Sequence, residues 1–292
     1  MGAEALKIRG LEKGFPGFHL GPIDITVPTG GMYGLIGPNG AGKTTTIDLI
    51  MGMGAKEKGT IEVFGLDHIR EEVAVKAKIG YVSPDLSFNA WGRVDRLVAF
   101  IRGFYPDWDD NYCDALMKRM KVGWHETISA LSYGSRMKLN LVVALAHRPA
   151  LLLLDEPLAG LDAISKHELF TELLEAIQDE TRTVIISSHN LDDIERFADH
   201  VGIIADGKML LEGPTAVLVE RFRIVDFVTD NGAAPKPVRG AYIQRRGDRR
   251  WRILVDTQEE AIERIRAQGF SDVSTAPVTL EELFVGLVKG QE

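Results

Sequence analysis

The stretch Gly37-Pro-Asn-Gly-Ala-Gly-Lys-Thr44 decides the fold of this chain. It follows the short apolar run 31–36 and precedes the helix-forming segment 44–51, so its glycines stand in a turn between a strand and a helix. Glycine lets successive backbone N–H groups point into one concavity, and the positive N-terminus of the next helix also attracts anions. The spacing GxxxxGKT therefore predicts a loop that cradles phosphate groups.

The residues of this loop have distinct predicted roles. Lys43 would place its ammonium group on the β- and γ-phosphates of a nucleoside triphosphate, and the Thr44 hydroxyl would bind Mg²⁺. The predicted phosphate-binding set is Gly37, Asn39, Gly40, Ala41, Gly42, Lys43, Thr44 and Thr45. The alternative is a fortuitous glycine-rich turn, which the position between a strand and a helix disfavours.

Two carboxylates follow a second apolar run, 151–154. A short run that is apolar throughout is typical of a strand covered on both faces of a parallel sheet. Such a strand would deliver Asp155 to its end, where the carboxylate can hold Mg²⁺, and Glu156 could polarise an attacking water as a general base. A solvated strand end is the alternative, and the phosphate loop upstream disfavours it.

Three further elements surround this strand in a fixed order: Leu131-Ser-Tyr-Gly-Ser135 before it, then Ala159-Gly-Leu-Asp162 and Ser188-His189 after it. With the two motifs above, this order resembles the ATP-binding subunit of ABC transporters over about residues 5 to 220. The resemblance implies ATP hydrolysis, with ATP and Mg²⁺ bound. It implies that Ser132 and Gly134 of the signature close on the γ-phosphate held by the opposite protomer. It also implies that Asp162 of the D-loop contacts across the dimer and that His189 senses the γ-phosphate.

The family stacks an aromatic ring on adenine, and Phe15 stands at the matching place. Phe18 is a close rival, and a plain packing role for Phe15 is the other alternative. The chain also departs from the family pattern where Gln usually contacts Mg²⁺, since Pro84 fills that place. Asp85 could substitute through a water, or the loop lacks this ligand. Tyr133 and Ser135 replace the usual Gly and Gln of the signature.

Strands that alternate with helices predict an α/β fold. We expect a P-loop NTPase core of mostly parallel sheet, with antiparallel strands at the N-terminus and an inserted helical subdomain at about 84–148. The predicted ATP-binding domain covers 1–222, and a small α+β domain covers 223–292. The second domain ends in a helix that begins near Thr279, where Glu282 three residues on completes a capping box.

The charge, the cysteine content and the lack of a long apolar stretch limit the kinds of function that the chain can have. The 292 residues include 34 Lys and Arg but 42 Asp and Glu, a net charge of −8, which disfavours a nucleic-acid partner. The single cysteine, Cys113, excludes an internal disulfide. No stretch approaches the roughly 20 apolar residues of a membrane-spanning helix. The resemblance to ABC transporters then implies a peripheral subunit on the cytoplasmic, inner face of the cell membrane, attached only through its partner.

Taken together, the motifs predict an ATP-hydrolysing subunit that powers transport through a separately encoded transmembrane permease. The C-terminal tail resembles that of export ATPases of the ABC-2 type, so we expect export. Two ATPase subunits would act as a homodimer or a heterodimer. The alternative is a soluble or regulatory ABC ATPase scaffold that uses ATP-dependent dimerisation without transport.

Overall fold

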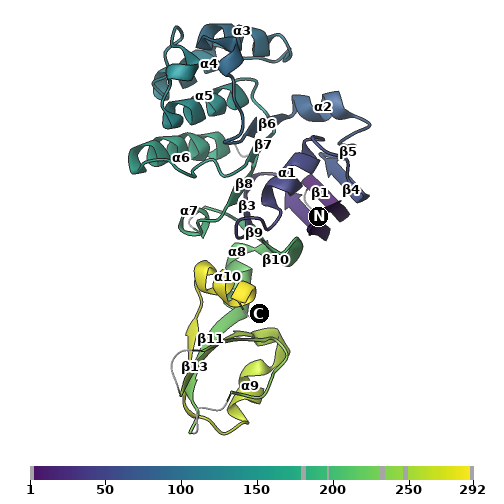
Figure 1. Ribbon diagram of the computed structural model, residues 1–292, viewed down its shortest axis with the longest axis vertical. Helices are drawn as coiled ribbons and strands as arrows, with labels where there is room; N and C mark the ends of the chain where they lie inside the picture. The colour runs from purple at the N-terminus through teal and green to yellow at the C-terminus, as the bar shows by residue number, and fades with distance from the viewer. Residues whose placement is uncertain (1–2, 179–181, 196, 231–233, 246–248, 290–292) are drawn as a thin grey trace.

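The computed structural model describes residues 3–178, 182–195, 197–230, 234–245 and 249–289 (Figure 1). The N-terminal part contains two sheets. A four-stranded antiparallel sheet has the order β2-β1-β4-β5, and a six-stranded sheet has the order β10-β9-β3-β8-β7-β6. The first sheet consists of β1 (Glu4–Phe15), β2 (Phe18–Pro28), β4 (Lys58–Val63) and β5 (Leu66–Asp67). The second consists of β3 (Gly31–Ile36), β6 (Ile79–Val82), β7 (Leu151–Leu154), β8 (Thr183–Ser188), β9 (His200–Ala205) and β10 (Lys208–Pro214).

The six-stranded sheet is parallel except at one edge. Strands β6, β7, β8, β3 and β9 run in the same direction, and β10 pairs with β9 antiparallel. Every residue of β7 and β8 is buried, as expected for strands that are covered on both faces. The predicted fold class, a mostly parallel core with antiparallel strands at the N-terminus, is confirmed.

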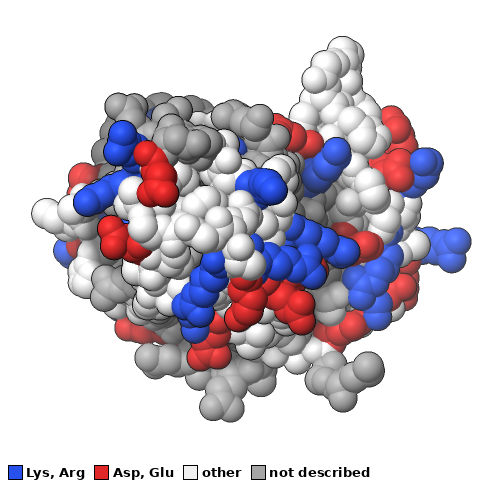
Figure 2. Space-filling model, turned by 90° about the horizontal axis from the view of Figure 1, so that it is seen from below, with Lys and Arg blue, Asp and Glu red and all other residues white. Residues whose placement is uncertain are grey.

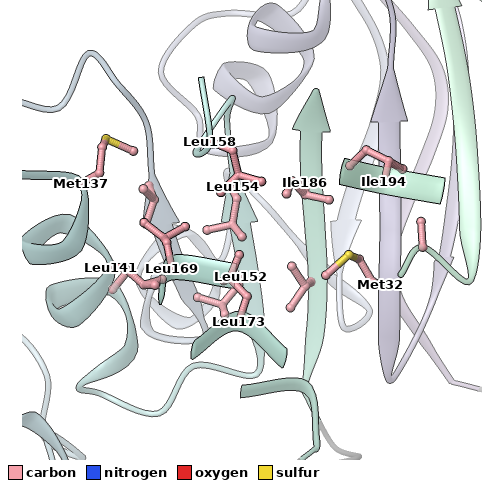
Figure 3. Close-up of a cluster of buried hydrophobic side chains, with 14 of the residues drawn as sticks. Met32, Met137, Leu141, Leu152, Leu154, Leu158, Leu169, Leu173, Ile186 and Ile194 are labelled. Atoms are coloured by element: carbon pink, nitrogen blue, oxygen red, sulfur yellow. The ribbon is translucent and has the colours of Figure 1, made fainter. Parts of the chain in front are cut away.

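Two hydrophobic cores fill the two faces of this sheet. One face packs against α5 (Tyr133–Leu145) and α6 (Ala163–Gln178), where Leu152 and Leu154 of β7 meet side chains of both helices (Figure 3). The other face packs against the antiparallel sheet and α1 (Lys43–Ile50). Burying one such leucine contributes about 1.5–3 kcal/mol, so the central strands hold the ends that carry the site in place.

The chain between β6 and β7 is helical, as predicted. It forms α3 (Val94–Arg102), α4 (Asp110–Arg119) and α5, with two short 3₁₀ turns, η1 (Asn89–Trp91) and η2 (Ile128–Ala130). The apolar spacing of α3 buries Val94, Leu97 and Val98 against the larger core and leaves its other face in solvent. A short helix, α2 (Glu72–Ala77), precedes β6.

A third, antiparallel sheet with the order β12-β13-β11-β14 lies at the opposite end of the molecule (Figure 1). Its strands are β11 (Phe222–Val228), β12 (Ala241–Arg245), β13 (Arg250–Asp256) and β14 (Ser271–Pro277). A 3₁₀ turn, η3 (Thr257–Glu259), leads to α9 (Ala261–Arg266), which packs on this sheet and closes a small core of its own.

The junction between the two ends is made by α8 (Thr215–Arg221) and the last helix, α10 (Leu280–Lys289) (Figure 1). The predicted capping box is present, because Thr279 and Glu282 exchange two hydrogen bonds of 3.1 Å. The backbone N–H of Leu280 also donates to Glu195 Oε1, at 3.1 Å, in the short helix α7 (Asp192–Glu195). The last helix thus ties the C-terminal sheet to the N-terminal part of the chain.

The face at the C-terminal end carries charges of both signs. Figure 2 shows basic side chains lying beside acidic ones across the middle of this face. Ion pairs of Arg252 with Asp226 and of Arg239 with Glu259 agree with that mixture. A mixed surface of this kind is typical of a solvated one.

Candidate functional site

The phosphate loop between β3 and α1 depends on glycine at two close approaches. Gly42 has a φ of +108°, and a Cβ there would lie 2.6 Å from Leu20 Cδ1. A Cβ at Gly37 would lie 2.3 Å from the carbonyl oxygen of Ile204. Both distances are shorter than van der Waals contact allows, so side chains at these positions would force the loop open.

Lys43 is buried at the centre of the loop. Its Nζ donates to the carbonyl oxygens of Gly37, at 2.8 Å, and Pro38, at 3.2 Å. It also forms an ion pair of 3.2 Å with Glu156 Oε1, without the alignment of a hydrogen bond. The ammonium group is therefore held inside the concavity, where it can act on phosphate oxygens.

Asp155 stands at the end of β7 and contacts the first turn of α1. Thr44 Oγ1 donates to Asp155 Oδ2 at 2.8 Å, and Ser187 Oγ donates to Asp155 Oδ1 at 2.6 Å. A hydroxyl and a carboxylate side by side are the hard oxygen donors that Mg²⁺ takes from proteins, which usually supply one or two ligands beside the phosphates. Among the described residues no group of three or more His, Cys, Asp or Glu is arranged to hold a metal ion. The donor set therefore fits a magnesium ion that is shared with a nucleotide.

Glu156 is the junction between the phosphate loop and the segment after β8. Its backbone N–H donates to Ser187 Oγ at 2.9 Å, and its Oε2 lies 2.8 Å from His189 Nδ1. Its φ of +44° is uncommon for a residue with a side chain. When Nδ1 carries the proton, His189 donates to this carboxylate, so Lys43, Glu156 and His189 form one continuous line of polar contacts.

A cavity of about 470 Å³ opens over this line of contacts. It is lined by Phe15, Phe18, Asn39, Gly40, Gly42, Lys43, Thr44, Thr45 and Glu156. The Phe15 ring is 46% exposed, and its centroid lies 6.3 Å from that of Phe18. Both aromatic side chains can therefore present a face to a base, and the choice between them stays open.

Asp85 is exposed and is not among the residues that line this cavity. It nevertheless influences Asp48, which lies one helical turn after Thr44. Burial raises the pKa of Asp48, and the negative charges of Asp155 and Asp85 raise this pKa further. The three carboxylates thus share one electrostatic environment around the loop after β6.

The signature residues and Asp162 form a second cluster. Ser132 caps α5, because its Oγ accepts the backbone N–H of Ser135 at 3.1 Å. Asp162 precedes α6 and accepts from the Ser165 N–H at 2.9 Å and from its hydroxyl at 2.8 Å, which lowers the pKa of this carboxyl. Gly134 faces Ser165, whose Oγ would lie 2.9 Å from a Cβ on that glycine.

Sequence reasoning missed Ser187 and Asp48. Ser187 lies on β8 directly beside Asp155, since Leu154 pairs with Ile186 in the parallel register. A polar residue near the end of an apolar strand is a weak signal for such a role. The four-residue spacing from Thr44 to Asp48 is the helical spacing that places two side chains on one face.

Comparisons with known proteins agree with this geometry. A model of the ABC transporter family matches residues 20–159. The ABC transporter ATP-binding protein YtrB of Bacillus subtilis is 29% identical over 289 residues, which cover 98% of this chain and 99% of YtrB. The Nod factor export ATP-binding protein I of Burkholderia lata is 31% identical over 229 residues, 74% of this chain and 73% of that protein. A solved ATP-binding subunit of an ABC transporter superposes with a TM-score of 0.67 over 74% of this chain and 92% of that chain, at 23% identity.

In the described part of the chain, no helix combines the length and the apolar character that a membrane crossing requires. The phosphate loop, the carboxylates at the end of β7 and the sheet order are those expected of an ATPase core. With relatives of this kind matched over most of its length, the chain belongs to the ABC transporter family as an ATP-binding subunit that hydrolyses ATP.

Proposed function

We propose that this chain powers export through a separately encoded transmembrane permease, by ATP-driven closure of two ATP-binding subunits. The observation that carries the proposal is the line of contacts from Lys43 through Glu156 to His189, whose middle residue shares Ser187 with Asp155. The name of the Nod factor export relative supports the direction of transport. Similarity to YtrB over nearly the whole chain supports a role that includes the C-terminal sheet.

Within this proposal the residues divide the chemistry. Glu156 accepts the proton of the attacking water, and His189 orients that carboxylate while it senses the γ-phosphate. Lys43 and the backbone of the loop hold the phosphates, and Thr44 with Asp155 would hold Mg²⁺. Bound Mg²⁺ would neutralise the charge that develops on the transferred phosphoryl group. Phe15 stacks on the base, with Phe18 as its rival.

The second cluster supports a dimer. Ser132, Gly134 and Asp162 make local hydrogen bonds or contacts at the starts of α5 and α6, and none of them lines the cavity at the phosphate loop. A signature that acts on ATP must then meet the ATP of another subunit. Two copies placed head to tail satisfy this for both sites at once, and a related second chain would also do so.

An exposed aromatic group on the helical subdomain supports contact with the permease. The ring of Trp91 lies 3.9 Å from that of Phe100, which lies 4.9 Å from that of Phe104. Phe100 and Phe104 are 45% and 66% exposed. Large exposed aromatic side chains of this kind mark interaction sites. We place the ATP-binding domain at 1–222 and the small domain at 223–292, on the inner face of the membrane.

The substitution Glu156→Gln tests the proposed reaction. It keeps the shape of the side chain and removes the base, so turnover should fall by about 10²-fold or more while ATP still binds and holds a stable dimer. Glu263→Gln, at an exposed position of α9, is the control and should leave both the turnover and the ATP-dependent dimer unchanged. Hydrolysis that survives Glu156→Gln would remove the assignment of the base.

The departures from the family pattern favour a second candidate, a regulatory scaffold that hydrolyses ATP slowly. This alternative rests on Pro84, which stands where the family has a Gln that contacts Mg²⁺, and on Tyr133, which replaces a Gly of the signature. Purification with a polytopic membrane protein would support transport, and repeated absence of such a partner would support the scaffold. If Asp85 takes the place of the missing Gln, Asp85→Ala should raise the Mg²⁺ concentration needed for half-maximal hydrolysis. An unchanged Mg²⁺ titration would exclude that role.

A further inference from the structure

The ring of Tyr133 packs against a loop of the same subunit. Tyr133 is the first residue of α5 and lies partly buried against the larger core. Its Cε1 is 3.5 Å from the position that a Cβ would take on Gly160, which has a φ of +71°. The ring edge thus lies against the side of Gly160 that a side chain would occupy, at the glycine where the D-loop, residues 159–162, turns.

The next residue along α5 makes a second contact with the same region. Gly134 lies so close to Ser165 that a Cβ on it would come 2.9 Å from the Ser165 hydroxyl. That hydroxyl donates to Asp162 at 2.8 Å. Consecutive residues of the signature turn, residues 131–135, therefore lie beside the D-loop and beside the first turn of α6 that follows it.

Tyr133 also senses charges outside the D-loop. Burial raises the pKa of its phenol, the positive charge of Arg136 lowers this pKa, and the negative charge of Asp85 raises it. Asp85 belongs to the loop that follows β6. A glycine at this position would leave the space of the Tyr133 ring empty.

We propose that Tyr133 is a positioning residue that locks the signature turn to the D-loop of its own subunit, so that both reach the partner's ATP as one rigid unit. The inference rests on the proposed head-to-tail dimer for its effect on activity. The lock itself is a property of a single subunit. It is made by ring packing, so phenylalanine should replace tyrosine and alanine should not.

Hydrogen exchange of the isolated full-length subunit tests the lock directly. In Tyr133→Ala the amides of residues 159–162 should exchange about tenfold faster than in the parent, because the turn at Gly160 loses the ring that lies against it. Tyr133→Phe should match the parent. Tyr112→Ala is the control. It removes another partly buried tyrosine, which lies in α4 and packs against Arg148, and it should leave exchange of the D-loop amides unchanged. If Tyr133→Ala folds poorly, Tyr133→Leu keeps the apolar bulk and still removes the ring.

ATP-driven dimerisation tests the consequence. In a Glu156→Gln background, Tyr133→Ala should need about tenfold more ATP for half-maximal dimer, because a D-loop that is not already ordered in the single subunit must be ordered when the dimer closes. Binding of a fluorescent ATP analogue to the monomer should not change, since Tyr133 does not line the cavity. A substitution that only destabilises the fold would not weaken dimerisation while leaving ATP binding to the monomer intact. Tyr133→Phe should dimerise at the same ATP concentration as the parent.

The two tests fail separately. If the Glu156→Gln parent shows no ATP-dependent dimer, the proposed function is wrong, and the exchange experiment still decides whether the lock exists. If Tyr133→Ala and Tyr133→Leu match the parent in both D-loop exchange and dimerisation, the inference is overturned.

Discussion

One buried hydroxyl holds both carboxylate residues of the site. Ser187 Oγ donates to Asp155 Oδ1 at 2.6 Å and accepts the backbone N–H of Glu156 at 2.9 Å. Ser187 is fully buried and Asp155 is 3% exposed, so water cannot replace a lost hydrogen bond there without disturbing the packing. The substitution Ser187→Ala removes both hydrogen bonds and adds nothing in their place.

The size of the effect follows from these two bonds. A hydrogen bond to a charged group contributes about 1.5–3 kcal/mol, and one between neutral groups about 0.5–1.5 kcal/mol. We therefore expect the free energy of unfolding to fall by about 2–4 kcal/mol. The turnover number should fall by about 10²-fold, because Asp155 and Glu156 lose the group that sets their relative position.

Urea denaturation measures the first effect and release of inorganic phosphate measures the second. Thr183→Val is the matched control at the opposite end of β8, where Thr183 Oγ1 accepts the Gly30 N–H at 2.9 Å. This buried hydroxyl is far from the carboxylates, so the control should lose about 1–3 kcal/mol of stability and keep its turnover. Turnover of Ser187→Ala within about twofold of the control would refute the positioning role.

Two further predictions concern stability away from the site. Burial lowers the pKa of His147 to about 4, so the unfolded chain binds this proton at a higher pH than the folded chain. The free energy of unfolding should therefore fall by about 3 kcal/mol as the pH drops from about 6.5 to about 4, and His147→Gln should remove that slope in urea titrations. In the same assay, Leu283→Ala in α10 should lower the free energy of unfolding by about 2–5 kcal/mol, because the Leu283 side chain is fully buried in the larger core. The exposed Glu281→Ala on the same helix should stay within about 0.5 kcal/mol of the parent, and equal losses for both would contradict the docked position of α10.

The parts of the site that could be predicted from the sequence are those whose chemistry demands a residue type at a local spacing. The phosphate loop requires glycine at Gly42 because a backbone with a φ of +108° and a neighbour at 2.6 Å tolerates nothing larger. Asp155 and Glu156 follow an apolar run that could only be a buried strand or helix, and its four-residue length favours a strand. Parallel strands end at one edge of a sheet, so contact between Thr44 and Asp155 was a reasonable expectation.

The residues that hold these groups in place could not be predicted, because their role depends on which elements become neighbours. Ser187 reaches Asp155 only because β8 lies between β3 and β7, an order that periodicity along the chain does not contain. Tyr133 meets Gly160 only because α5 and α6 start side by side. Neither a hydroxyl in a strand nor a ring at a helix start is required by the chemistry of ATP hydrolysis. Such residues become visible only through the packing, and the same packing determines how far their loss would displace the catalytic groups.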